Sequence, residues 1–185
     1  MKAVFLDRDG TIGGTGGGVH PFEFSLYEFA PDAIKVLNDL GLKVFLYTNQ
    51  TRVGRGYFTE DELIKGFEIM KEDLVKQSAF LDDIFYCPHK PEDGCECQKP
   101  KIGLLIKAKE KYNLNLNECY VVGDTGNSDM LAANLAGTKK VLVKTGWGEG
   151  SLTTHRENWK DVEPDYIAND LVDAVSWISN DLKRK

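Results

Sequence analysis

Acidic residues stand directly after short apolar runs of the chain, where they could serve metal or acid–base chemistry. Asp7 and Asp9 follow the run AVFL, and Asp124 follows the run YVVG. Carboxylates gathered at one place repel one another unless a cation lies among them, and a set of oxygen ligands suits Mg²⁺. The alternative is that each aspartate only caps a helix or a turn. Thr48 and Lys99 follow two other predicted strands, and this coincidence favours a functional cluster.

The stretch CPHKPEDGCECQKP carries a different kind of chemistry. It holds Cys87, His89, Cys95 and Cys97, a set that matches tetrahedral coordination of Zn²⁺ by three cysteines and one histidine. A disulfide or a redox-active thiolate is the alternative, but in a reducing cytosol such a cluster more often binds metal. Because the protein fills all four positions, we predict a structural zinc-binding loop at 87–97.

The predicted zinc ion explains why a lysine follows the loop so closely. The loop lacks apolar residues to hold it, whereas structural zinc sites contribute roughly 10–16 kcal/mol of apparent binding free energy. An ion bound there would anchor the chain next to Lys99, and Pro100 would stiffen the chain on the other side. Cys119 starts a predicted buried strand and is interpreted as a small apolar residue.

Apolar runs that alternate with stretches of helical spacing predict the fold. Strands that are nearly all apolar, separated by helices of ten or more residues, indicate a parallel sheet covered on both faces. We therefore predict a three-layer α/β sandwich with a mainly parallel, Rossmann-like sheet and a site beyond the carboxyl ends of its strands. The predicted strands are 2–7, 43–48, 84–87, 119–123, 140–145 and a short one near 166–167, and the predicted helices are 31–40, one opening with a capping box at 59–62, 104–112, 128–136 and a final C-terminal helix.

Length and composition are those of a globular protein. At 185 residues, 42% hydrophobic and 28% charged, the chain is expected to form one domain, 1–185. No apolar run is long enough to cross a bilayer and no signal-peptide pattern opens the sequence, so the cytoplasm is the expected location. The net charge of −6 argues against binding to nucleic acid. Nothing in the sequence requires a dimer, and a monomer is expected.

Four separate motifs resemble a known family. DRDGT after the first predicted strand, LYTNQ around Thr48, Lys99, and VVGDTGNSD after the fourth strand resemble the motifs of haloacid dehalogenase-type phosphohydrolases, in the same order along the chain. CPH followed by CxCxKP is similar to the zinc-containing branch with heptose-bisphosphate and histidinol-phosphate phosphatases. The resemblance covers residues 1–148. Neither gap between motifs is long enough for the cap domain that many family members carry.

The resemblance implies a role for each matching residue. Asp7 would attack phosphorus and form an aspartyl phosphate, and Asp9 would protonate the leaving oxygen and then activate water. Mg²⁺ would be held by Asp7, Asp124 and the main-chain carbonyl of Asp9. Thr48 would donate a hydrogen bond to the phosphoryl group, and Lys99 would place a positive charge beside it.

Asp129 has two interpretations. The family resemblance implies that Asp129 supports the metal without being one of its direct ligands. The other interpretation is that Asp129 is an acid in the first turn of a helix, where the helix dipole favours a negative charge.

The resemblance implies that the substrate is a small phosphate ester, whose alcohol the motifs do not specify. Asn49, Arg52 and Arg55 are the candidate substrate-binding residues, because arginine suits bidentate phosphate contacts; taken alone, each arginine is more often a solvated surface residue. The branch typically has basic residues where this chain has Gln98 and Thr125, which weakens the case for a bisphosphate.

Heptose 1,7-bisphosphate is the leading expectation, with histidinol phosphate or another small sugar phosphate as alternatives. The glycine-rich stretch at 13–18 either contacts the substrate or is a flexible linker. Two further alternatives are a non-catalytic, zinc-stabilised interaction module and a phosphatase that acts on nucleic-acid ends. The acidic balance of the chain counts against the second of these.

Overall fold

A single six-stranded parallel sheet forms the centre of the protein. The computed structural model describes residues 1–184, and the strands lie in the order β3-β2-β1-β4-β5-β6. The central strand β1 pairs with β2 on one side and with β4 on the other. Because all strands run the same way, their carboxyl ends meet at one edge. The strands are β1 Ala3–Leu6, β2 Lys43–Asn49, β3 Asp83–Cys87, β4 Tyr120–Gly123, β5 Lys139–Val143 and β6 Tyr166–Ala168.

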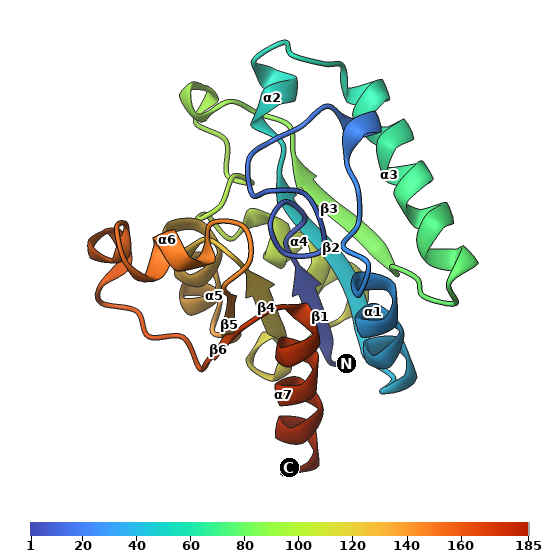
Figure 1. Ribbon diagram of the computed structural model, residues 1–185. Coiled ribbons are helices and arrows are strands. Elements are labelled where there is room, and N and C mark those ends of the chain that lie inside the picture. The colour runs from blue at the N-terminus through green and yellow to red at the C-terminus, as the bar shows by residue number, and fades with distance from the viewer. Residues whose placement is uncertain (185) are drawn as a thin grey trace.

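Helices cover both faces of the sheet, which gives the expected three layers (Figure 1). α1, α3 and α7 lie on one face, and α4 and α5 lie on the other. The α-helices are α1 Ala30–Asp39, α2 Thr51–Gly54, α3 Glu60–Lys76, α4 Gly103–Tyr112, α5 Leu131–Ala136, α6 Gly148–Leu152 and α7 Leu171–Lys183. Short helical turns are η1 Pro21–Glu23, η2 Pro91–Asp93, η3 Leu116–Glu118, the π-helical turn η4 Gly126–Met130, and η5 Arg156–Trp159.

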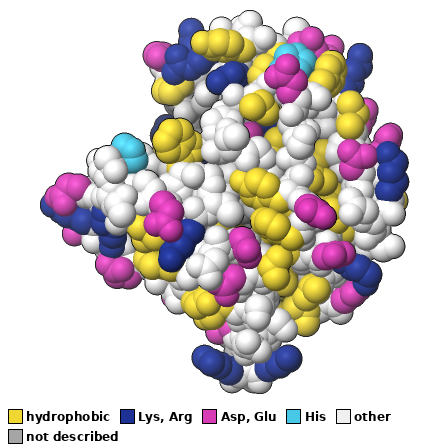
Figure 2. Space-filling model, viewed as in Figure 1, with side chains coloured by type: hydrophobic (Ala, Val, Ile, Leu, Met, Phe, Trp, Pro, Cys, Tyr) yellow, Lys and Arg dark blue, Asp and Glu magenta, His cyan; other side chains and the backbone are white. Residues whose placement is uncertain are grey.

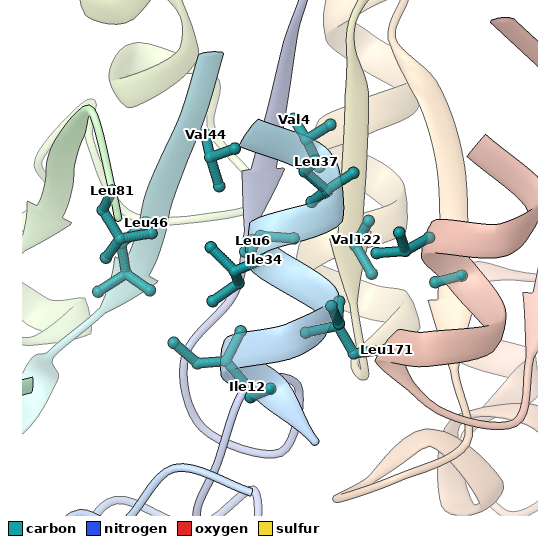
Figure 3. Close-up of a cluster of buried hydrophobic side chains, with 14 of the residues drawn as sticks. Val4, Leu6, Ile12, Ile34, Leu37, Val44, Leu46, Leu81, Val122 and Leu171 are labelled. Carbon is teal, nitrogen blue, oxygen red and sulfur yellow. The ribbon is translucent and has the colours of Figure 1, made fainter. Parts of the chain in front are cut away.

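The central strands β1, β2 and β4 are buried on both faces, and their alternate side chains contribute to two separate cores. Val4 and Leu6 of β1 point into the first core, where they meet Ile34 and Leu37 of α1 (Figure 3). Phe5 of β1 points to the opposite face and packs in the core beneath α4 and α5. The apolar runs seen in the sequence are thus explained by burial on two sides.

The predicted elements are confirmed, with local differences at loops. The capping box opens α3: the Thr59 amide donates to Glu62 Oε2 at 2.7 Å, and the Glu62 amide donates to Thr59 Oγ1 at 3.1 Å. The predicted helix 128–136 instead begins with the π-helical turn η4 and continues as α5. Three short elements, α2, α6 and η5, have no apolar periodicity that would have predicted them.

The face formed by α1, α3 and α7 carries both apolar and charged side chains (Figure 2). Val36, Ile69 and Val172 are among its exposed large hydrophobic residues. Acidic and basic groups are interspersed with them, a mixture that is ordinary for a protein surface. No helix within residues 1–184 is long and apolar enough to span a membrane.

The orientation of α1 over the sheet can be tested with two substitutions on the same helix. Ile34 is fully buried, whereas Val36 is 43% exposed. Ile34→Ala should lower the free energy of unfolding by about 2–5 kcal/mol, because it removes packed methyl groups and leaves a cavity. Val36→Ala should change it by no more than about 0.5 kcal/mol. Urea unfolding followed by circular dichroism measures both; equal losses would show that the helix face is assigned wrongly.

Candidate active site

The carboxyl ends of the central strands surround a polar cavity of about 230 Å³. It lies where the loops after β1, β2 and β4 meet the segment that carries Lys99, as the position of the chemistry-bearing residues in the sequence predicts. Its lining includes Asp7, Asp9, Gly16, Gly18, Thr48, Asn49, Gln50, Arg52, Lys99, Asp124, Thr125 and Asp129.

Lys99 is the buried positive charge of this cavity. Its Nζ donates to Asp7 Oδ1 at 2.9 Å, to Asp129 Oδ1 at 2.6 Å and to the Tyr47 carbonyl at 3.1 Å. Burial alone would lower the pKa of Lys99, but the carboxylates of Asp129 and Asp7 raise it above its ordinary value. The ammonium group is therefore charged at neutral pH and fixed by three acceptors.

Asp7, Asp124 and Asp129 form a cluster of buried carboxylates. One oxygen from each can be chosen so that all three atoms lie within 4.8 Å of one another. Burial raises the pKa of Asp7 well above its usual range, and the charges of Asp129 and Asp124 raise it further against the opposing effect of Lys99. Burial, helped by Asp129, raises the pKa of Asp124 to about 7. Without a further cation, Asp7 and Asp124 are thus driven towards their neutral forms.

The donor set of this cluster fits a magnesium ion. Three carboxylates against the single ammonium of Lys99 leave two negative charges (3 − 1 = 2), the charge that one divalent cation balances. The ligand atoms are all oxygens, which Mg²⁺ prefers. Asp129 lies inside the cluster and also accepts a hydrogen bond from the Thr125 amide at 3.1 Å. Asp129 thus lies beside the candidate metal ligands and also in the first turn of η4, a position that fits both interpretations.

Asp124 is held in place by the main chain around it. Its Oδ2 accepts a hydrogen bond from the Trp147 amide at 2.7 Å, and its Oδ1 accepts one from the Thr125 hydroxyl at 3.0 Å. Gly10 and Gly146 both have positive φ, and a Cβ on either would lie about 2 Å from Asp124 Oδ2, at 2.1 and 2.2 Å respectively. Only glycine lets these two loops approach the carboxylate so closely.

Asp9 lines the same cavity but does not belong to the cluster of three carboxylates. Arg8 donates to both of its carboxylate oxygens, at 3.0 and 3.1 Å, and Gln50 Nε2 donates to Oδ2 at 3.2 Å. Gln50 Nε2 also donates to Thr48 Oγ1 at 2.9 Å. The two residues predicted to act on the ester, Asp9 and Thr48, are thus joined by one amide.

The three predicted substrate-binding residues have different positions. Arg52 lines the cavity. Asn49 lines it too, but its side chain binds the main chain of Lys99: its amide donates to the Lys99 carbonyl at 3.2 Å, and its oxygen accepts from the Lys99 amide at 3.0 Å. Arg55 lies in a separate hollow, where it is 4.0 Å from Glu92. Arg52 is therefore the member of the set best placed to meet a substrate.

The glycine-rich stretch forms part of the cavity wall. Gly16 and Gly18 both line the cavity, and they run past two large side chains. A Cβ on Gly16 would lie 2.4 Å from Trp147 Cδ1, and a Cβ on Gly18 would lie 2.7 Å from Arg52 Nε. This close packing does not match a loose linker, and it brings the stretch to the place where a substrate would bind.

The cysteine stretch gathers its four predicted ligands around one point. His89 Nδ1 lies 3.5 Å from Cys87 Sγ and 3.1 Å from Cys97 Sγ, and Cys87 Sγ lies 3.5 Å from Cys95 Sγ. In a tetrahedral zinc site with Zn–S bonds of about 2.3 Å, sulfur atoms lie roughly 3.7 Å apart, slightly further than these atoms. Within residues 1–184, no disulfide joins any of the four cysteines. The donors fit zinc, and the cluster lies two residues before Lys99.

Sequence reasoning did not identify three residues that shape the site. Arg8 is 1% exposed, and its guanidinium stacks over the Phe24 ring at 4.6 Å while it pairs with Asp9. Gln50 bridges Asp9 to Thr48. Trp147, which is 52% exposed, packs against the glycine-rich stretch. Arg8 and Gln50 lie within the motifs DRDGT and TNQ, so their position beside predicted site residues was an available signal; Trp147 gave none.

Known proteins resemble the chain over nearly its whole length. A family model of HAD-hydrolase-like proteins matches residues 96–174. The D-glycero-beta-D-manno-heptose-1,7-bisphosphate 7-phosphatase of Haemophilus ducreyi is 40% identical, over 96% of this chain and 98% of that protein. The enzyme of the same name from Escherichia coli K12 is 35% identical, over 99% of this chain and 96% of that protein.

A solved structure shares the fold of this protein. The crystal structure of D,D-heptose 1,7-bisphosphate phosphatase from B. bronchiseptica, complexed with magnesium and phosphate, has a TM-score of 0.89 and 31% identity, and covers 98% of this chain and 99% of that chain. Fold, site and relatives together define a phosphohydrolase with a parallel α/β sheet. The chain belongs to the haloacid dehalogenase-type phosphatases, as the four motifs predict.

The raised pKa values of Asp7 and Asp124 predict how stability responds to pH and magnesium. A carboxyl group whose folded pKa is raised from 3.8 to about 7 stabilises the metal-free fold at low pH, and this stabilisation is lost as the pH rises through about 7. Bound Mg²⁺ favours the ionised form, so it should raise Tm more at about pH 8 than at about pH 5.5. Differential scanning fluorimetry with and without Mg²⁺ measures both effects. Asp124→Asn is the control and should weaken both; an equal magnesium shift at the two pH values would contradict the cluster.

Proposed function

We propose that the protein is a magnesium-dependent phosphomonoesterase that works through an aspartyl-phosphate intermediate on a small sugar phosphate. The observation that carries this proposal is the position of Asp7: it lines the cavity, 2.9 Å from the ammonium of Lys99 and within the carboxylate cluster. A carboxylate beside a fixed positive charge, in a cavity open to an ester, is suited to attack phosphorus.

Each step follows from a residue of the cavity. Asp7 bonds to phosphorus as the bond to the ester oxygen breaks, and Asp9 gives its proton to that oxygen. Asp9 then takes a proton from water, which attacks phosphorus and releases phosphate and free Asp7. Thr48 Oγ1 accepts from Gln50, so its own hydrogen, which makes only a 3.5 Å contact with the Asn49 carbonyl, can donate to a phosphoryl oxygen.

Positive charge for the phosphoryl group comes from two sources in this proposal. Lys99 supplies one, held by its contacts with Asp7 and Asp129. A magnesium ion held by Asp7, Asp124 and the carbonyl of Asp9 would neutralise the oxygens of the transferred group and lower the pKa of the carboxyl groups that bind it. Asp129 would support the ion from beside these ligands.

For the substrate, we propose D-glycero-D-manno-heptose 1,7-bisphosphate. The support is that relatives 35–40% identical over nearly the full length of the chain are heptose-1,7-bisphosphate 7-phosphatases. Histidinol phosphate or another phosphate monoester is the competing substrate, because Gln98 and Thr125 carry no charge. Thr125 lines the cavity and uses its hydroxyl for Asp124, so it adds no cation for a second phosphate.

For the cysteine stretch, we propose a structural zinc ion that positions Lys99. Among the loop residues, Pro91, Glu92, Asp93 and Gly94 are all exposed, so little apolar packing holds the loop. The ion would fix one end of the segment, and Asn49 holds the other by its two hydrogen bonds to the main chain of Lys99. The charge of Lys99 is then delivered from a rigid support.

Replacing the nucleophile tests the reaction. Asp7→Asn should abolish Mg²⁺-dependent hydrolysis of p-nitrophenyl phosphate, because the amide does not form the phosphoenzyme. The removal of one buried carboxylate lessens repulsion in the cluster, so Tm should not fall. Glu96→Gln, a change at an exposed acid outside the cavity, is the matched control. A folded Asp7→Asn protein with near-normal turnover would rule out the nucleophile; an inactive wild type would favour the interaction module.

Removing one zinc ligand tests the loop. Cys97→Ser should lose bound zinc, lower Tm and reduce kcat in saturating Mg²⁺, because Lys99 loses its support. Metal content by mass spectrometry, together with turnover, provides the readout. Cys119→Ala is the control, since Cys119 is buried between η3 and β4 and its replacement should leave the zinc content unchanged. Zinc-free protein that turns over at the wild-type rate would show that the ion does not position Lys99.

A further inference from the structure

Arg52 is a half-buried guanidinium at the wall of the catalytic cavity. It comes from α2, the short helix that directly follows β2. Its guanidinium carbon lies 5.2 Å from the centroid of the Tyr57 ring, and a Cβ on Gly18 would lie 2.7 Å from Arg52 Nε. A ring and a loop thus confine the side chain, which lowers the entropy it would lose when it binds an anion.

No acidic side chain neutralises Arg52. Within residues 1–184, no carboxylate lies within 4.0 Å of its guanidinium, and it makes no hydrogen bond to the protein. The other cations nearby are already paired: Lys99 with Asp7 and Asp129, and Arg8 with Asp9. Arg52 is therefore the one cation in the described lining of the cavity that has its donors available for a substrate.

The rest of the site offers no equivalent charge. Thr125 is neutral, and its hydroxyl is bound to Asp124. Arg55 faces the separate hollow and lies 4.0 Å from Glu92. A substrate with a second anionic group would consequently meet a free positive charge only on the side of α2 and the glycine-rich stretch. Arginine binds phosphate through two parallel hydrogen bonds, which suits this task.

We propose that Arg52 binds the second phosphate of a bisphosphate substrate, the group that is not hydrolysed, and so makes the enzyme prefer a bisphosphate over the corresponding monophosphate. The proposal rests on the proposed function, because it assumes that the first phosphate binds at Asp7 and Lys99. It places the alcohol part of the substrate along the glycine-rich stretch, between Arg52 and the reacting carboxylate. The contact exists before and during the reaction, so it should act on KM rather than on kcat.

The experiment compares heptose 1,7-bisphosphate with heptose 7-phosphate, two esters that differ only in the second phosphate. Arg52→Ala should lower kcat/KM for the bisphosphate by about 10- to 100-fold, mainly through KM, and the loss on the monophosphate should be at least about tenfold smaller. Arg52→Lys should restore part of the preference, since it keeps the charge but not the paired donors. Arg55→Ala removes the same charge three residues away and should preserve the preference.

Each outcome decides between the two proposals. A selective loss on the bisphosphate supports the role of Arg52. Equal losses on both esters, a similar loss in Arg55→Ala, or a wild-type enzyme that hydrolyses both esters equally well overturns it and leaves the phosphatase activity standing. A wild-type protein that hydrolyses neither heptose ester, but does hydrolyse p-nitrophenyl phosphate, also overturns it and contradicts the proposed substrate. Failure to hydrolyse any ester in Mg²⁺ contradicts the proposed function itself.

Discussion

Electrostatic repulsion among buried carboxylates is the constraint on which the structure of the site depends. Asp7, Asp124 and Asp129 come from the ends of two strands and a helical turn, and one lysine compensates only part of their charge. At an effective dielectric constant of about 20, two like charges about 4 Å apart repel by roughly 4 kcal/mol. A fold of ordinary stability does not tolerate several such repelling pairs. Protonation relieves the repulsion in the metal-free protein, and a divalent cation relieves it while keeping Asp7 ionised for attack.

The rest of the fold is arranged to hold this cluster still. The parallel sheet brings the strand ends together, and glycines at 10 and 146 let two loops close on Asp124 without a steric clash. Lys99 reaches the cluster from a segment that follows the cysteine stretch, and Asn49 binds its main chain from the end of β2. Precision at a site comes from such supporting contacts, because a charge displaced by about 1 Å loses much of its effect on the transition state.

Much of the fold was predictable from the sequence, because buried parallel strands read as continuous apolar runs and the capping box at Thr59 marks the start of α3. The convergence of Asp7, Thr48, Lys99 and Asp124 followed from their places after those strands. The partners of individual side chains could not be predicted in this way. Asn49 was a candidate substrate ligand, but its amide group binds the main chain of Lys99. Arg52 and Arg55 were equivalent candidates in the sequence, but Arg52 lines the cavity and Arg55 lines a separate hollow. These contacts depend on the direction in which each side chain points after the end of β2, and the spacing of residues in the sequence does not determine that direction.

The most direct test of the account is to locate the metal. Crystals of the wild-type protein grown with Mn²⁺ in place of Mg²⁺, with diffraction data collected on both sides of the manganese absorption edge, reveal where the ion binds. The account predicts one manganese peak at the carboxyl end of the sheet, coordinated by Asp7 and Asp124 and close to Asp129. A manganese-saturated crystal whose only peak lies elsewhere, or whose carboxylate cluster holds no metal, would contradict it.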